Sequence, residues 1–134
     1  MRASEPRFSH ASITIGDVSQ DYNIFRNDKI FITTSLDLQE AHRFEIYFSK
    51  SSYYKISWVC IWDSKLSKED NIEVRVLFDN TQEFLYEKIN EILSGVSLIF
   101  VEEGNHIVSF DIKTNLEGEE VRLNKSRLEI SRVF

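Results

Sequence analysis

Side chains that could bind a metal or act as nucleophiles are few and widely spaced in this sequence. None of the three histidines belongs to an H-x-H or H-E-x-x-H pattern; they are His10, His42 and His106. A metal site needs several converging ligands, so we interpret them as surface or turn residues, with His106 partly buried at a strand start. Cys60 lies in the middle of a predicted strand between two tryptophans, which favours a buried thiol over a nucleophile. No G-x-S-x-G motif accompanies the serines.

Carboxylates occur as adjacent pairs at three places, which are Glu69-Asp70, Glu102-Glu103 and Glu119-Glu120. Catalysis by two carboxylates depends on their separation in space, which a sequence does not show. The run from Asp111 to Glu117 is a poor match to a calcium-binding loop. We interpret the pairs as solvated turns and expect a protein that is not an enzyme and has no cofactor or metal. A site assembled only by the fold would leave no such local pattern.

The most distinctive side chains are aromatic and gather in two neighbouring predicted strands: Phe44, Tyr47, Phe48, Tyr53, Tyr54, Trp58 and Trp62. Exposed aromatic rings stack on sugars or anchor a protein partner, whereas buried rings form the core. Trp58 shares a strand face with Ile56 and Cys60, so we assign it to the core. Trp62 ends its strand and fits either role.

The composition is that of one globular domain spanning residues 1–134. Hydrophobic residues make up 42% and charged residues 28%, which is too apolar for a disordered chain. The net charge of −6 argues against nucleic acid as the main partner, because phosphate binding relies on Lys and Arg. No segment approaches the roughly 20 apolar residues of a membrane span. Residues 1–10, expected to be flexible, lack the apolar stretch of a secretory signal, so we expect a cytoplasmic protein without membrane attachment.

Apolar and polar residues alternate along much of the chain with the period of two that is typical of half-buried strands. The pattern changes after residue 80, where Asn80 and Glu83 fit a capping box. Apolar residues then recur at helical spacing; they are Leu85, Ile89, Ile92 and Leu93. The sequence therefore predicts an all-β, mainly antiparallel β-sandwich of about nine short strands with one short helix over 81–93. A strand distorted by a bulge is the alternative for that segment.

Residues 43–134 resemble the immunoglobulin-like or fibronectin-III-like β-sandwich at the level of fold. The resemblance is carried by Ile-Ser-Trp-Val-Cys-Ile-Trp around Trp58, by Glu-Gly-Asn-His-Ile-Val-Ser-Phe-Asp-Ile around His106, and by the closing Leu-Glu-Ile-Ser-Arg-Val-Phe. It implies that Trp58 fills the core and that a turn with glycine leads into the penultimate strand. His106 stands near the place of a corner tyrosine, and the paired cysteines of antibody domains are absent. A jelly roll of the carbohydrate-binding kind fits the same closing segment, so both topologies stay open.

The closing segment, Val121 to Phe134, alternates charged and apolar side chains. Its apolar row either packs on the protein's own core or backs a basic outer strand that docks a partner or a second copy. We therefore favour a non-catalytic β-sandwich interaction module that binds a protein partner or assembles into a larger complex. The alternative is a carbohydrate-binding module with an aromatic platform. The candidate surface residues are Tyr53, Tyr54, Trp62, Arg122, Arg127, Arg132 and Phe134.

Overall fold

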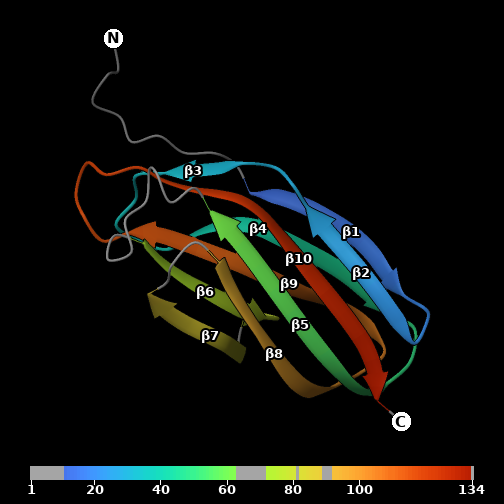
Figure 1. Ribbon diagram of the computed structural model, residues 1–134. Helices are drawn as coiled ribbons and strands as arrows, with labels where there is room; N and C mark the ends of the chain where they lie inside the picture. The colour runs from blue at the N-terminus through green and yellow to red at the C-terminus, as the bar shows by residue number, and fades with distance from the viewer. Residues whose placement is uncertain (1–10, 63–71, 81, 89–91, 134) are drawn as a thin grey trace.

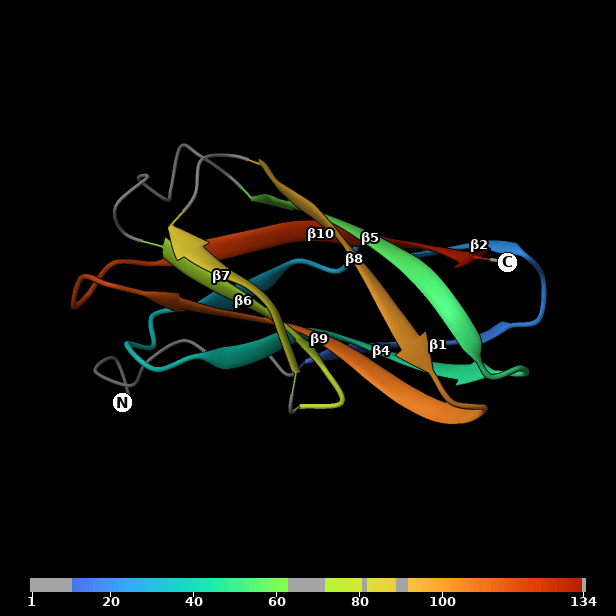
Figure 2. The same ribbon diagram turned by 90° about the horizontal axis from the view of Figure 1, so that it is seen from below.

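The protein folds into two packed β-sheets in the computed structural model, which describes residues 11–62, 72–80, 82–88 and 92–133 (Figures 1 and 2). Sheet I contains, in spatial order, β1 (Ser12–Val18), β4 (Gln39–Phe48), β9 (Gly104–Thr114), β6 (Ile72–Phe78) and β7 (Gln82–Lys88). Sheet II contains β2 (Tyr22–Asn27), β10 (Val121–Val133), β5 (Ser52–Trp62) and β8 (Ile92–Val101), and β3 (Phe31–Thr33) also pairs with β10. β1 runs parallel to β4, and the other pairs are antiparallel.

The order of the strands is that of a jelly roll. From β3 onward the chain crosses to the other sheet at every connection in the described topology except the one from β6 to β7. This places β2-β10-β5-β8 opposite β4-β9-β6-β7, the double Greek-key arrangement of a jelly roll. An immunoglobulin-like sandwich would instead pair its first two strands in one sheet. The predicted β-sandwich is therefore correct, whereas the immunoglobulin-like topology is wrong and the jelly-roll alternative describes the connections.

The core lies between the sheets and is built by the predicted alternation of apolar residues. Phe44, Ile46 and Phe48 of β4 are at most 1% exposed, and so are Leu128 and Ile130 of β10. Trp58 and Cys60 of β5 are also buried, as expected. β5 lies between β10 and β8, which confirms that it is a central strand.

The helix predicted over 81–93 is not present in the described part of that segment. Gln82–Lys88 forms β7 and Ile92 begins β8, while residues 81 and 89–91 lie outside the described residues. Asp79 and Asn80 have φ angles of 53° and 59°, which reverse the chain after β6 and which Asp and Asn tolerate better than most residues. The spacing of the apolar residues predicted a helix wrongly, because residues four apart share one face of a strand as well as one face of a helix.

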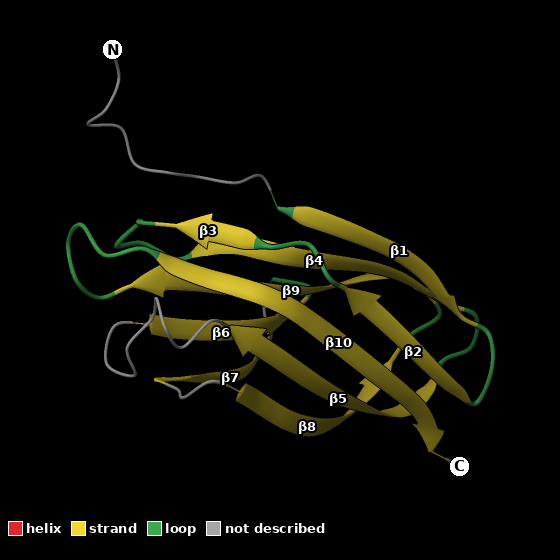
Figure 3. Cartoon of the chain, turned by 45° about the horizontal axis from the view of Figure 1, so that its top comes forward, coloured by secondary structure: helices red, strands yellow, loops and turns green. Residues whose placement is uncertain are grey.

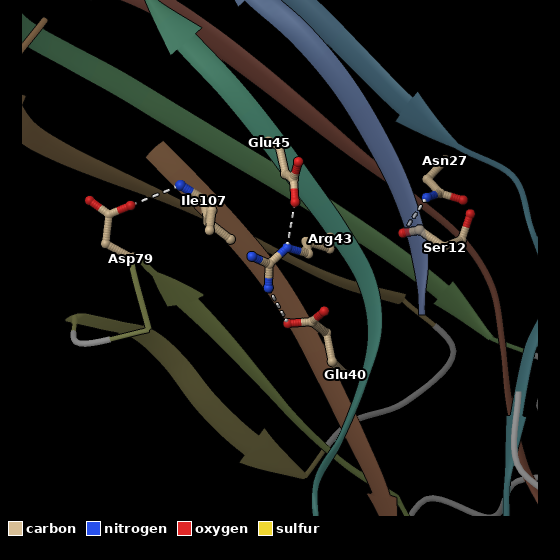
Figure 4. Close-up of polar contacts among 7 residues, drawn as sticks. All are labelled: Ser12, Asn27, Glu40, Arg43, Glu45, Asp79 and Ile107. Atoms are coloured by element: carbon tan, nitrogen blue, oxygen red, sulfur yellow. Dashed lines mark hydrogen bonds and ion pairs between the residues drawn. The ribbon is translucent and has the colours of Figure 1, made fainter. Parts of the chain in front are cut away.

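Asp79 fastens this turn to β9. Its backbone N–H donates to the Ile107 carbonyl at 2.7 Å, and its Oδ1 accepts the Ile107 N–H at 2.8 Å (Figure 4). Its Oδ2 lies 2.7 Å from Nδ1 of His106, whose ring also stacks on Phe78. Asp79 and Asn80 therefore form the turn of a hairpin within sheet I, where the sequence predicted a helix cap at Asn80. His106 is partly buried at the start of β9, as expected.

His42 joins the two sheets inside the core, which corrects its assignment to the surface or a turn. It is fully buried on β4, where Nε2 donates to the Lys29 carbonyl at 2.7 Å. Because a carbonyl only accepts, Nδ1 of the neutral ring accepts the Ser126 hydroxyl of β10 at 2.6 Å. Burial lowers the pKa of His42, which keeps the ring neutral near neutral pH.

Within the described residues, no helix is long and apolar enough to cross a membrane.

Gly95 allows the indole of Trp58 to lie against β8, because a Cβ at position 95 would meet Trp58 Cζ2 at 2.5 Å. Trp58 is only 3% exposed and has no room to withdraw. We expect Gly95→Ala to lower the free energy of unfolding by about 1–3 kcal/mol, measured by urea denaturation. Ser94→Ala, an exposed change on the same strand, is the control. Equal stability of the Gly95 variant and the wild type would contradict this packing.

Candidate binding surface

The outer face of sheet II carries a patch of exposed apolar side chains at its β5–β8 end. Tyr53 and Phe100 are directly opposed, and their rings meet edge to face with centroids 5.3 Å apart. Leu98 and Val96 precede Phe100 on the same face of β8 and are 61% and 60% exposed. On the other side of Tyr53, Val133 of β10 is 40% exposed. We call these five residues the apolar patch.

β8 is an edge strand without charge. Among the described residues it pairs with β5 alone, and Figure 3 shows it at the end of sheet II. Natural edge strands are commonly blunted by charged residues or proline, because their free N–H and C=O groups invite pairing with another chain. None of the ten residues of β8 is Asp, Glu, Lys, Arg or Pro. An uncharged edge beside an exposed apolar patch is typical of an interaction surface.

The opposite end of the same face is hollowed into a basic pocket of about 370 Å³. The register places Arg127 of β10 between Arg26 of β2 and Val59 of β5. Lys125 lies opposite Ile61 one step further along. The pocket is lined by Arg26, Asp28, Val59, Ile61, Lys125, Ser126 and Arg127. Three of these seven residues are cations and two are aliphatic, whereas Asp28 is the one acidic residue among them.

The predicted aromatic surface is divided between the two faces of β5. Tyr53 is 56% exposed, but Tyr54 is 1% exposed and its hydroxyl donates to the Lys50 carbonyl at 2.7 Å. Tyr54 is therefore a core residue and contributes nothing to an exposed platform. Trp62 ends β5 opposite Leu123, and its side chain lies outside the described residues.

The basic residues predicted for the closing strand are also divided. β10 pairs with β2 and β3 on one side and with β5 on the other, so it is not an edge strand and cannot accept another strand. Arg127 lies on the outer face, 3.3 Å from Glu129. Arg132 has the inward-facing register of Leu128 and Ile130, and its guanidinium lies 4.0 Å from the Asp21 carboxylate. Arg122 lies opposite Ile32 of β3, and Phe134 is outside the described residues.

Neither the apolar patch nor the basic pocket was predicted from the sequence, and the reasons differ. The lack of charge from Ile92 to Val101 is visible in the sequence and could have marked the edge strand. The pocket has no such signal, because Arg26 and Arg127 become neighbours only through the pairing of β2 with β10. No group of three or more metal-ligating side chains occurs among the described residues.

A polar cluster covers the middle of the outer face of sheet I. Arg43 binds Glu45 at 2.8 Å and Glu40 at 3.3 Å (Figure 4). On β9, Asp111 lies opposite both Glu40 and Arg75. Burial and the nearby Glu40 carboxylate raise the pKa of Asp111 to about 6, against the opposing effects of a hydrogen bond from Ser109 and of Arg75. This carboxyl therefore titrates within the pH range of most stability measurements.

No protein-family model and no curated protein matches the sequence. Solved structures with a similar backbone include rabbit GITRL, at 13% identity over 74% of this chain and 78% of that chain, with a TM-score of 0.47. The C-terminal CBM6 of the laminarinase LamC from Zobellia galactanivorans is 10% identical over 80% and 98% of the two chains, with a TM-score of 0.40. The Podospora anserina GH26-CBM35 mannanase aligns over 96% of this chain and 28% of its own, at 10% identity and a TM-score of 0.45. At this level of similarity, the fold assignment rests on the strand pairing itself.

We expect Asp111→Asn to stabilise the protein at pH 7.5 and to do so much less at pH 4.5. The folded-state pKa of about 6 lies above the ordinary aspartate value of 3.8, so between these two pH values the native state binds a proton that the unfolded state has lost. Stability contributed by the protonated form is lost as the pH rises through 6. After discounting for solvent exposure, the thermal midpoint at pH 7.5 should rise by about 3 °C. A lower midpoint for Asp111→Asn than for the wild type at pH 7.5 would contradict the assignment.

Proposed function

We propose that the protein is a non-catalytic β-sandwich interaction module that assembles through the β8 edge and the apolar patch. One observation carries this proposal: an edge strand of ten uncharged residues contributes three of the five exposed side chains of the apolar patch. Pairing of an extended strand with β8 would satisfy its free backbone groups and place apolar side chains beside Val96, Leu98 and Phe100.

A second copy of the chain is the partner that fits this edge best. In a two-fold symmetric contact each strand meets its own copy, so a charge on the edge would be placed near its own equivalent. β8 avoids that repulsion in a chain whose net charge is −6. Antiparallel pairing of two β8 strands would join the two copies of sheet II into one continuous sheet.

β1, an edge strand of sheet I, is less suited to this role. β1 also exposes apolar side chains, with Ile13 at 54% and Ile15 at 77%. However, it is shorter and carries the exposed carboxylate of Asp17. A charged edge of this kind resists pairing with its own copy.

A carbohydrate-binding role is less well supported by the same face. Sugar rings stack on flat, exposed aromatic surfaces. Tyr53 and Phe100 meet at an interplanar angle of 71°, so the two rings do not make one flat platform. Tyr54 is buried and cannot extend it.

Light scattering after size-exclusion chromatography tests the proposal over a range of protein concentrations. We expect the wild type to form a concentration-dependent dimer, and Leu98→Lys to weaken dimerisation at least tenfold by placing a charge beside the partner's β8 and its equivalent lysine. Ile15→Lys on β1 is the matched control and should leave the dimer intact, and circular dichroism checks the fold of both variants. A wild type that stays monomeric at all concentrations, or equal effects of the two variants, would overturn self-association. Binding on a glycan array that is lost in Tyr53→Ala would instead favour the carbohydrate-binding alternative.

A further inference from the structure

The basic pocket on sheet II is made by a local irregularity in β10. Strict alternation after Leu123, which is fully buried, would turn position 125 toward the core as well. The pairing of β10 with β5 instead shifts between Leu123, opposite Trp62, and Lys125, opposite Ile61. This bulge brings exposed Lys125 onto the outer face with Arg127. Bulges of this kind re-aim side chains and are frequent beside functional sites.

Arg26 and Arg127 are like charges placed directly opposite each other in the β2–β10 pair. Directly opposed residues have Cβ atoms roughly 5 Å apart, and like charges in such a pair are destabilising. Arg127 is partly compensated by Glu129 at 3.3 Å. Within the part of the chain that the structure describes, neither Arg26 nor Lys125 forms an ion pair with a carboxylate. Asp28 is the one acidic residue among the described lining residues.

The remaining lining is suited to the body of a small organic molecule. Val59 and Ile61 of β5 form an aliphatic side of the pocket. The volume of about 370 Å³ falls within the range of roughly 300–1,000 Å³ found for small-molecule sites. A bare inorganic ion would leave the aliphatic side uncovered.

We propose that this pocket binds a small organic phosphate, with the phosphate group held among Arg26, Lys125 and Arg127 and the apolar body against Val59 and Ile61. Guanidinium groups pair with phosphate through two parallel hydrogen bonds, and lysine adds a point charge. A phosphomonoester carries up to two negative charges at neutral pH, which matches the excess of cations better than a single carboxylate does. This inference does not rest on the proposed assembly, because the pocket lies at the opposite end of the outer face from the apolar patch.

Isothermal titration calorimetry with 1-naphthyl phosphate tests the proposal, and methyl NMR locates the ligand. We expect saturable binding that weakens as the NaCl concentration rises, with shift changes at the methyl groups of Val59 and Ile61. The double variant Arg26→Gln, Lys125→Gln should weaken binding at least tenfold. Lys55→Gln removes one exposed charge from the same face outside the pocket and should change the affinity less than twofold.

Two related ligands test the chemical class. Inorganic phosphate should bind more weakly because it lacks the apolar body, and 1-naphthoate should bind more weakly because it carries one charge. Naphthoate that binds as tightly as the phosphate would overturn the assignment to phosphate. Absence of binding by the wild type at millimolar ligand, or equal losses in the double variant and Lys55→Gln, would overturn the site. Circular dichroism of each variant establishes that a loss of binding is not a loss of fold.

Discussion

The pairing of β10 on both of its sides is the interaction on which the rest of the structure depends. This strand pairs with β2 and β3 on one side and with β5 on the other, so it joins the two halves of sheet II. Its inward residues Leu128 and Ile130 are fully buried, and Ser126 reaches across to His42 of sheet I. Its outward residues contribute two cations to the basic pocket and Val133 to the apolar patch. Loss of the β10 register would therefore disturb the core and both candidate surfaces together.

Much of the fold could be predicted from alternation, because alternation records which face of a strand is buried. Alternation correctly separated Ile56 and Trp58 from the outward residues of β5. Because adjacent residues of a strand point to opposite faces, it also places Tyr53 and Tyr54 on different faces. It does not record which strands are neighbours. The charges of the closing strand therefore indicated an outer face but left open whether the strand was central or an edge, since a central strand of a sandwich also has an outer face. The helix prediction failed for a related reason, because a spacing of four residues satisfies both periods.

The candidate sites were harder to predict because each depends on pairing between distant segments. The apolar patch joins residues of β5, β8 and β10, and the basic pocket joins β2, β5 and β10. Lys125 shows the difficulty most clearly: simple alternation from Leu123 would place it inward, and only the bulge turns it outward. Residue type alone therefore identified basic and aromatic candidates without indicating which of them share a surface.

The two ends of the outer face differ in the kind of ligand they can hold, although they share a rigid support. At the apolar end the free edge of β8 offers unsatisfied backbone groups, so an occupant must bring a strand of its own. At the basic end the pocket opens onto the face of the sheet around Ser126 and Arg127, which are paired with both β2 and β5, so an occupant meets mainly side chains there. There Ser126 is hydrogen-bonded to the buried, neutral ring of His42, which fixes the floor of the pocket to sheet I. A ligand that binds against such a fixed wall loses less binding energy to ordering of the protein. The hydrogen bond between the sheets therefore suits the basic end to small molecules, whereas the open edge of β8 suits the apolar end to a polypeptide.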